Sequence, residues 1–181
     1  GVFGNLSKGL EEKVAGVILA AGGSSRFGRP KQLLPWGEQN FVNTVLQTAR
    51  LVGLDPLIIV LGNCADVVRT TIQDEDVQVL INSDWKLGQS TSLKLAVNHL
   101  GEDIAGAIFL LSDQPHLTVD FLASIAEQGR KSSKVVVPYI NDRRTSPVFF
   151  PASCFDKFRV LTGDQGGRQI MSECPVVLFP W

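Results

Sequence analysis

The chain has 181 residues, of which 44% are hydrophobic and 19% charged, and its formal net charge is -1 at pH 7. This length and balance are typical of one globular domain with a sizeable core, and they exclude a disordered chain. The near-neutral charge excludes a global basic field that would draw the chain to nucleic acid or acidic membranes, and no apolar run reaches bilayer-spanning length.

The first residues, 1–13, mix Gly, Ser, Lys and Glu, and we expect a flexible segment ahead of one domain over 14–181. Short, nearly all-apolar runs then recur along the chain, rich in Val, Ile and Leu and bounded by Gly, Pro, Asn or Asp. Such runs are typical of strands that are buried on both faces of a parallel sheet. These strands are expected at 14–20, 56–61, 77–81, 104–111 and 135–139.

Segments with helical spacing separate these runs, and they are expected at 40–52, 65–72, 90–100 and 119–129. The strict alternation of strand and helix predicts the fold class α/β, as a single-domain, doubly wound, mostly parallel sheet flanked by helices. The tail continues with an expected strand at 144–150, short helices at 151–160 and 165–171, and a last strand at 175–179.

The cysteines Cys64, Cys154 and Cys174 are odd in number and widely separated. Their spacing fits neither a disulfide framework nor a C-x-x-C metal site. We interpret all three as buried thiols in a reducing compartment and therefore expect a cytoplasmic protein.

The loop after the first strand, Ala21-Gly22-Gly23-Ser24-Ser25, consists of small residues. Ligands of open α/β sheets bind at the carboxyl ends of the strands, where such a loop lets backbone N–H groups approach an anion. Arg26 adds a forked donor that suits phosphate oxygens, and Lys31 adds a point charge. The loop therefore predicts a phosphate site, against the alternative of a glycine-rich turn that only joins two elements.

Two better-known phosphate loops do not fit this segment. Gly22-Gly23 has the wrong spacing for the dinucleotide fingerprint G-x-G-x-x-G, and no long helix follows at once. Gly23 and Gly28 have the spacing of a P-loop, but Arg29-Pro30 replaces its Lys and Ser/Thr. A nicotinamide-dependent oxidoreductase is correspondingly disfavoured.

Asp113 comes directly after the apolar run that ends at Leu111, at the same edge of the expected sheet as the first loop. Mg²⁺ in proteins takes one or two carboxylates and fills its remaining positions with phosphate oxygens and water. Asp113 is therefore the candidate metal ligand. The alternative role, capping the helix that begins near Thr118, is better filled by Thr118 itself.

The run Leu19 to Pro35 reads L-A-A-G-G-S-S-R-F-G-R-P-K-Q-L-L-P, which resembles the signature of the MobA-like nucleotidyltransferases. Within that family it is most similar to the molybdenum cofactor cytidylyltransferases. The resemblance implies a Rossmann-like fold of the nucleotide-diphospho-sugar transferase type. It also implies an enzyme that transfers CMP from CTP to the phosphate of molybdopterin or its molybdenum complex, with Mg²⁺ or Mn²⁺ as cofactor and release of pyrophosphate.

The resemblance assigns residues to each part of this reaction. It implies that Arg26, Lys31 and the metal ligand Asp113 are the catalytic residues. The segment 82–93 is similar to the family's base pocket, although for Ser90 the role of helix N-cap stays open beside a ligand role. The nucleotide-binding set is Leu19, Ala20, Ala21, Gly22, Gly23, Ser24, Ser25, Arg26, Lys31, Gly88, Gln89, Ser90 and Ser92.

The acceptor-binding set is Gln114, Pro115, Thr145, Ser146, Asp164 and Arg168. Where the family reads R-x-G-[HN]-P-V, this chain has Thr145-Ser146 in place of the Gly-His or Gly-Asn pair, which leaves the acceptor's identity open. Asp164 is either a second carboxylate on the metal side or the cap of a helix that starts near Gln165.

Two further functions stay open beside CMP transfer. The first is a guanylyl- or cytidylyltransferase that acts on another small phosphate ester. The second is a non-catalytic cofactor carrier for a molybdoenzyme, because family members continue into a closing segment that is missing after Trp181. The expected partners are CTP, a molybdopterin-type substrate, and a molybdoenzyme or its chaperone; neither nucleic acid nor a membrane is expected.

Overall fold

The computed structural model describes residues 12–22, 31–101 and 103–181. The flexible segment expected at 1–13 therefore lies almost wholly outside the described residues. Among the helices within the described ranges, none combines the length and the apolar character that crossing a membrane requires.

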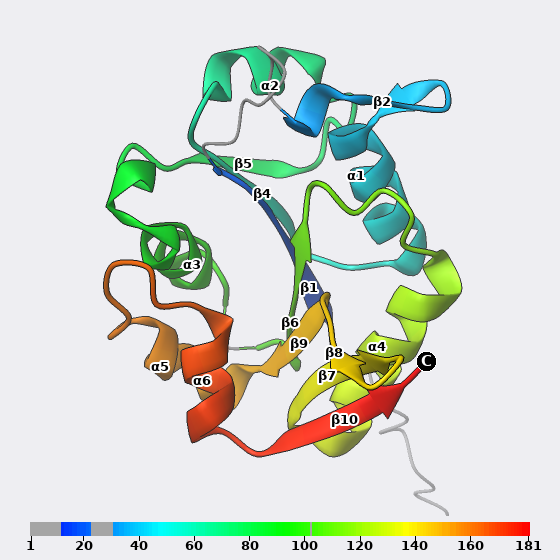
Figure 1. Cartoon of the computed structure of the whole chain (residues 1–181), viewed down its shortest axis with the longest axis vertical. Coiled ribbons are helices and arrows are strands. Elements are labelled where there is room, and N and C mark those ends of the chain that lie inside the picture. Colours follow the sequence, from blue (N-terminus) through cyan, green and yellow to red (C-terminus); the bar gives the residue numbers. More distant parts are fainter. Residues whose placement is uncertain (1–11, 23–30, 102) are drawn as a thin grey trace, which may run out of the picture.

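The sheet confirms the expected α/β class (Figure 1). Over the described residues it has eight strands, in the order β10-β7-β9-β6-β1-β4-β5, with β8 paired to β7. Strands β1, β4, β5 and β6 are parallel, whereas β9 runs antiparallel between β6 and β7. The strands of this sheet are β1 Val14–Ala20, β4 Leu57–Leu61, β5 Gln78–Ile81, β6 Gly106–Leu111, β7 Val135–Ile140, β8 Arg143–Arg144, β9 Val148–Pro151 and β10 Val176–Pro180.

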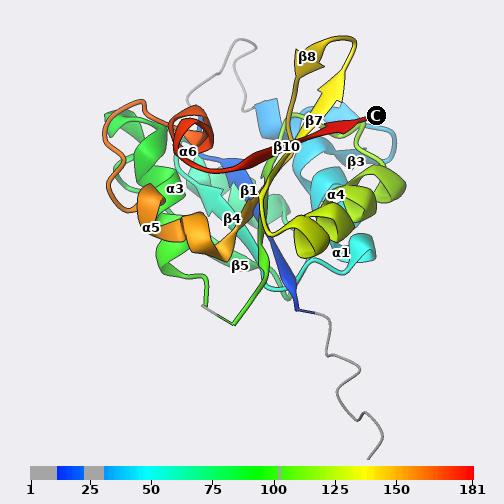
Figure 2. The same cartoon turned by 90° about the horizontal axis from the view of Figure 1, so that it is seen from below.

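Helices cover both faces of the sheet, as the doubly wound prediction required. Figure 2 shows α1 and α4 on one face and α3, α5 and α6 on the other. The helices are α1 Phe41–Val52, α2 Ala65–Thr71, α3 Gln89–Asn98, α4 Val119–Ser132, α5 Phe155–Phe158 and α6 Gly167–Glu173, with 3-10 helices η1 Lys31–Leu33, η2 Trp85–Leu87 and η3 Ala152–Cys154.

The central strand β1 shows why both layers are needed. Its successive side chains point to opposite faces, so Ile18 packs in the core beneath α1 and α4, whereas Val17 packs in the core beneath α3. Both side chains are fully buried. The nearly continuous apolar runs of the sequence therefore reflect strands that are covered on both sides.

Local capping sets the ends of α1. The Asn40 side chain accepts a hydrogen bond of 2.9 Å from the Asn43 N–H at its start, and Gly53 ends it with φ +85. Asn40 also belongs to a short hairpin that the sequence pattern did not indicate, formed by β2 Pro35–Trp36 and β3 Gln39–Asn40. These strands are too short to show a period of two.

Several expectations for the second half need correction. The strand predicted at 144–150 is divided into β8 and β9, which both pair antiparallel with β7, because the residues between them include Pro147, which has no N–H to donate to the sheet. The helix predicted at 151–160 is reduced to η3 and α5, and α6 begins at Gly167 rather than at Gln165. These are segments with little or no regular hydrophobic period.

The prediction that all three cysteines are buried is confirmed for only one of them. Cys154 is buried, but Cys174 is half-buried and Cys64 is exposed. Cys64 lies just before α2 in a left-handed conformation, at a position where the chain leaves the sheet. The Cys154 thiol donates a hydrogen bond of 2.7 Å to Cys174 Sγ, which joins η3 to the end of α6.

Candidate active site

The carboxyl end of β1 lies where the strand order reverses, because β4 pairs with one of its sides and β6 with the other. Such a switch point is where open α/β sheets bind their ligands. Leu19 and Ala20 end this strand, and Ala21 and Gly22 continue it. The remaining predicted loop residues, Gly23, Ser24, Ser25 and Arg26, lie outside the described residues, and so does the side chain of Lys31.

A cavity of about 590 Å³, called cavity 1 below, opens at this switch point. It is formed by the ends of β1 and β6, by η1 and η2, by the start of α3 and by Asp164. The lining residues are Leu19, Ala20, Ala21, Gly22, Gln32, Trp85, Lys86, Gly88, Gln89, Ser92, Leu111, Ser112, Asp113 and Asp164. Most of the described residues predicted to bind the nucleotide therefore meet in one place.

Gln32, which the sequence interpretation did not select, anchors η1 to the end of β1. Its side chain is buried, and its Nε2 donates a hydrogen bond of 2.8 Å to the carbonyl oxygen of Ala20. A carbonyl oxygen only accepts hydrogen bonds, so this contact also sets the orientation of the Gln32 amide. The Gln32 amide therefore belongs to the wall of cavity 1 and keeps the first loop's two ends close together.

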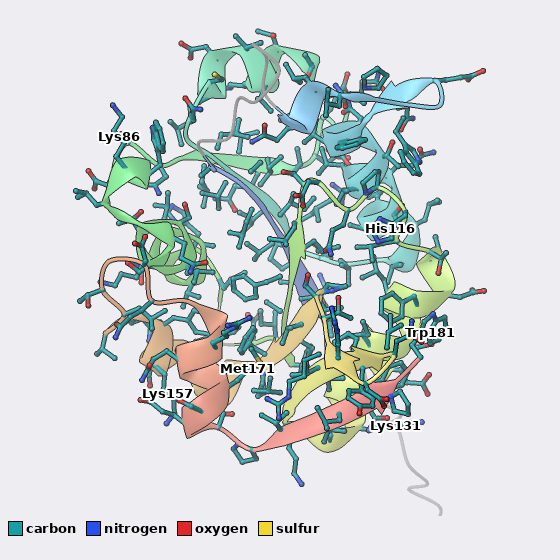
Figure 3. All side chains as sticks on the ribbon, in the orientation of Figure 1. Lys86, His116, Lys131, Lys157, Met171 and Trp181 are labelled. Carbon is teal, nitrogen blue, oxygen red and sulfur yellow. The ribbon has the colours of Figure 1, made fainter. Side chains whose placement is uncertain are left out.

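Trp85 was likewise missed as a site residue, and it closes another side of cavity 1. It packs so tightly on β4's end that a Cβ added to Gly62 would lie 2.8 Å from Trp85 Cβ and 2.9 Å from Ala21 Cβ. The Lys86 ammonium lies 5.6 Å from the centre of the Trp85 ring. Figure 3 shows Lys86 at the outer edge of the molecule in that view.

Asn82 organises the polar turn that leads into α3. It is buried, and its Nδ2 donates hydrogen bonds of 2.8 Å to both Thr91 Oγ1 and Ser92 Oγ. Its Oδ1 accepts a hydrogen bond of 3.0 Å from the Asp84 N–H. This buried amide therefore joins the turn to the helix, and it holds Ser92 on the wall of cavity 1.

Ser90 has a different role from both of those considered for it. The N-cap of α3 is Gly88, so the expectation of Ser90 as N-cap is wrong. Ser90 is buried and does not line the cavity; its Oγ and N–H both donate to the carbonyl oxygen of Gly163, at 2.7 and 3.2 Å. Gln89 Nε2 adds a hydrogen bond of 2.8 Å to the carbonyl oxygen of Asp164. The start of α3 thus anchors the loop at 162–166.

The two carboxylates Asp113 and Asp164 both line cavity 1. Helix α4 is capped by Thr118, whose Oγ1 accepts from the Phe121 N–H at 3.2 Å, so capping is not the role of Asp113. Helix α6 follows Gly166 without a side-chain cap, so the interpretation of Asp164 as a helix cap is wrong. Two carboxylates facing one cavity suit a divalent cation that shares its other positions with phosphate and water.

Among the described residues, no three side chains of His, Cys, Asp or Glu gather into a group able to hold a metal by themselves. A cation in cavity 1 would therefore be held jointly by protein carboxylates and ligand oxygens. This is the arrangement that Mg²⁺ adopts with nucleotide phosphates.

A second cavity of about 780 Å³, called cavity 2 below, adjoins the first. Both cavities are lined by Leu19, Leu111 and Gln89, so these three side chains form the boundary between them. Cavity 2 is lined by Leu19, Gln89, Leu93, Phe109, Leu111, Val137, Arg144, Thr145, Ser146, Val148, Phe150, Phe158, Gly167, Arg168, Met171 and Ser172. In Figure 3 the labelled Met171 lies beside α6, on the wall of this cavity.

The predicted acceptor residues are divided between several places. Thr145, Ser146 and Arg168 line cavity 2, whereas Asp164 lines cavity 1. Gln114 lines neither, but its Oε1 accepts a hydrogen bond of 3.1 Å from Ser146 Oγ, which joins the loop of Asp113 to the chain between β8 and β9.

Pro115 is buried and reaches neither cavity. The sequence interpretation also missed the apolar and aromatic lining of cavity 2, together with Arg144 and Ser172. Apolar residues at the ends of strands carry the same signal as ordinary core residues, so nothing in their pattern marks them as a ligand site.

The chain is similar to known proteins over most of its length. Residues 16–177 match the family described as the MobA-like NTP transferase domain. A protein named probable molybdenum cofactor guanylyltransferase from Rhodopirellula baltica is 31% identical over 150 residues, covering 80% of this chain and 71% of that protein. A protein named nicotine blue oxidoreductase from Paenarthrobacter nicotinovorans is 30% identical over 170 residues, covering 90% and 83%.

Among solved structures, Rv0371c from Mycobacterium tuberculosis H37Rv superimposes with a TM-score of 0.85 and 29% identity, over 94% of this chain and 89% of that one. Another structure of that protein, in complex with manganese, superimposes with a TM-score of 0.81 and 28% identity, over 94% and 88%. The similarity thus extends over nearly the whole of both chains.

Proposed function

The chain belongs to the MobA-like NTP transferase family, and from this premise we propose that it transfers CMP from CTP to the phosphate of a molybdopterin-type acceptor. It is an enzyme of the nucleotidyltransferase class. The observation that carries the proposal is the pair of adjoining cavities, which share Leu19, Leu111 and Gln89 at the switch point of the sheet. Two substrates that must exchange a group need such neighbouring sites with a common boundary.

Cavity 1 is the proposed nucleotide site. Its lining includes Ala21 and Gly22, with which the glycine-rich sequence begins, and the small residues of that sequence suit the triphosphate. The turn held by Asn82 and Trp85 would face the base and ribose. The choice of CTP is supported by the sequence Ala20-Ala21-Gly22, which is similar to the corresponding motif of cytidylyltransferases. The relative from Rhodopirellula baltica is named a guanylyltransferase, so GTP is the competing nucleotide.

Asp113 and Asp164 are the proposed ligands of the divalent cation, Mg²⁺ or Mn²⁺. A manganese complex of the structural neighbour Rv0371c supports the use of such a metal. When bound, the cation supplies positive charge to the phosphate oxygens and so stabilises charge that builds up during transfer. Asp113 lies just beyond the end of β6, two residues after the boundary residue Leu111, which is where the two substrates would meet.

The reaction then needs no protein nucleophile. An oxygen of the acceptor phosphate attacks the α-phosphorus of CTP, the bond from that phosphorus to the oxygen bridging to the β-phosphate breaks, and pyrophosphate leaves with both electrons of the broken bond. Arg26 and Lys31 are proposed to stabilise the charge on this leaving group. The acceptor phosphate is already ionised at neutral pH, so no general base is assigned.

Cavity 2 is the proposed acceptor site, with Thr145, Ser146 and Arg168 on its wall. The hydrogen bond from Ser146 to Gln114 would hold the acceptor side of the site against the loop that carries Asp113. Ser146 stands where the family usually has His or Asn. A small phosphate ester other than molybdopterin is therefore the alternative acceptor.

Pyrophosphate release from the purified chain tests the proposal. We expect release with CTP, molybdopterin and Mg²⁺ or Mn²⁺, and slower release when GTP or ATP replaces CTP. Faster release with GTP would assign the chain to the guanylyl branch. A stable complex with CTP or molybdopterin that releases no pyrophosphate would favour the cofactor carrier.

The metal assignment is tested by Asp113→Ala, which should lower the rate of pyrophosphate release by at least about a hundredfold while the melting curve stays unchanged. Glu75→Ala is the matched control, because Glu75 is an exposed acid that lines neither cavity. Full activity of the Asp113 variant would contradict the assignment.

A second candidate function is an oxidoreductase reaction. It is favoured by the relative named nicotine blue oxidoreductase. Two assays separate this reaction from nucleotidyl transfer. Oxidation of a reduced nicotinamide without pyrophosphate release would support the redox reaction. Pyrophosphate release without oxidation of a reduced nicotinamide would support nucleotidyl transfer.

A further inference from the structure

Cavity 2 carries an unbalanced positive charge. Among the described residues that line it, Arg144 and Arg168 are charged, and none of the others is a carboxylate. Both arginine side chains are exposed at the cavity rather than buried in the core. The described lining of cavity 1 differs, because it includes the two carboxylates Asp113 and Asp164 together with Lys86.

Neither guanidinium is neutralised by the protein within the described ranges. Other arginines do have carboxylate partners: Arg50 pairs with Asp74, and Arg159 pairs with Asp156. The ion pairs and side-chain hydrogen bonds of the described residues include no carboxylate for Arg144 or Arg168. Two guanidiniums beside an apolar cavity favour an anion between them, since a guanidinium forms paired hydrogen bonds with phosphate or carboxylate.

The two arginines come from different parts of the fold. Arg144 lies on β8, where it pairs with Tyr139 of β7, and the following Thr145 N–H donates a 3.0 Å hydrogen bond to the carbonyl oxygen of Pro138. Arg168 lies in the first turn of α6, next to the Gly166 backbone that packs on Gln89. Figure 2 shows β8 next to β7 at the projecting end of their hairpin, and α6 near α3 and α5.

The apolar wall of the cavity includes three phenylalanine rings, which are largely buried and pack on one another. The rings of Phe109 and Phe158 stack with their centres 5.3 Å apart and an angle of 9° between their planes. Phe150 meets both rings edge-on, at 5.6 and 5.1 Å. An apolar cavity whose lining includes two exposed cations suits a largely apolar ligand that bears an anionic group.

We propose that Arg144 and Arg168 together bind the anionic group of the acceptor, and that Arg144 determines which acceptors are accepted. This rests on the proposed function for the identity of the site as the acceptor site. The family resemblance assigns Arg168 to the acceptor but gives no role to Arg144. Removing Arg144 would leave the apolar wall in place and would weaken the preference for an anionic compound.

The experiment compares two fluorescent probes, pterin-6-carboxylate and uncharged pterin, by titration against the purified full chain. We expect tighter binding of the carboxylate probe by the unsubstituted chain. Arg144→Gln should reduce that preference about tenfold, since the loss of one charge-assisted hydrogen bond costs about that factor. Arg143→Gln is the matched control, because Arg143 lies on the same short strand and lines neither cavity.

The outcomes separate this proposal from the proposed function. The proposal is overturned if the unsubstituted chain shows no preference between the probes, including the case in which it binds neither. It is also overturned if Arg144→Gln keeps the preference or if Arg143→Gln loses it equally, because a general surface field would then explain the result. Pyrophosphate release is measured separately, so an anion site that survives without transfer activity would count only against the transferase proposal.

Discussion

Replacement of Gly88 by alanine should detach the loop at 162–166 from the start of α3. Gly88 has φ +116 and ψ 165, a conformation that residues with a side chain rarely adopt. A Cβ at this position would lie 2.1 Å from the carbonyl oxygen of Gly163 and 2.9 Å from the Asp164 nitrogen. Both neighbours are backbone atoms, which cannot turn aside as a flexible side chain would.

The expected loss of stability follows from the contacts that hold this loop. Ser90 N–H and Oγ donate to Gly163, and Gln89 Nε2 donates to Asp164. At about 1 kcal/mol for each hydrogen bond, their loss costs about 3 kcal/mol. Backbone strain adds up to about 3 kcal/mol where it is not relieved, so the free energy of unfolding should fall by about 3–6 kcal/mol.

Urea unfolding of Gly88→Ala beside Gly163→Ala provides the assay. Gly163 faces Gly88 but has φ +54 and open space around an added Cβ, so its replacement should cost only about 1–2 kcal/mol. Because Asp164 would leave cavity 1 with the loop, Gly88→Ala should also weaken the binding of Mn²⁺ with CTP. If the two variants unfold within about 1 kcal/mol of each other, the reasoning about the backbone clash is refuted.

Two further predictions concern ionisable groups. The hydrogen bonds from Arg50 lower the pKa of the Asp74 carboxyl, so Asp74→Asn should reduce the free energy of unfolding by about 1–2 kcal/mol at pH 7. This deficit should disappear in urea titrations as the pH falls through the lowered pKa, and a deficit independent of pH would contradict the ion pair. Burial and the hydrogen bond to Cys174 raise the pKa of the Cys154 thiol to about 12. A disulfide reagent at pH 8 should therefore label Cys64 and Cys174 well before Cys154, and equal rates for all three would refute this.

Much of the fold was predictable because each strand carries its own signal. The run Val14–Ala20 is apolar on both faces and became β1 with the expected bounds. Thr118 was expected to cap a helix, and its hydroxyl does accept from the first turn of α4. Burial on both faces and helix capping depend on residues that are neighbours in sequence, so the pattern reveals them.

The errors occurred where distant segments decide the structure. Serine is a common N-cap residue, but the Ser90 hydroxyl donates a hydrogen bond to the carbonyl oxygen of Gly163, 73 residues away. Asp164 precedes a helix, but it lines cavity 1 because Gln89 and Ser90 hold its loop there. No local pattern distinguishes a serine that caps its own helix from one that binds a remote carbonyl group.

The sequence by itself therefore determined the α/β class, the strands that end at the ligand-binding edge, and the resemblance carried by residues 19–35. Only the tertiary structure decided that cavity 1 and cavity 2 share a boundary at Leu19, Leu111 and Gln89, and that Arg144 and Arg168 line the same cavity. The physical reason is that strand and helix formation depend on nearby residues. A cavity and its charge depend instead on how elements from the whole chain pack together.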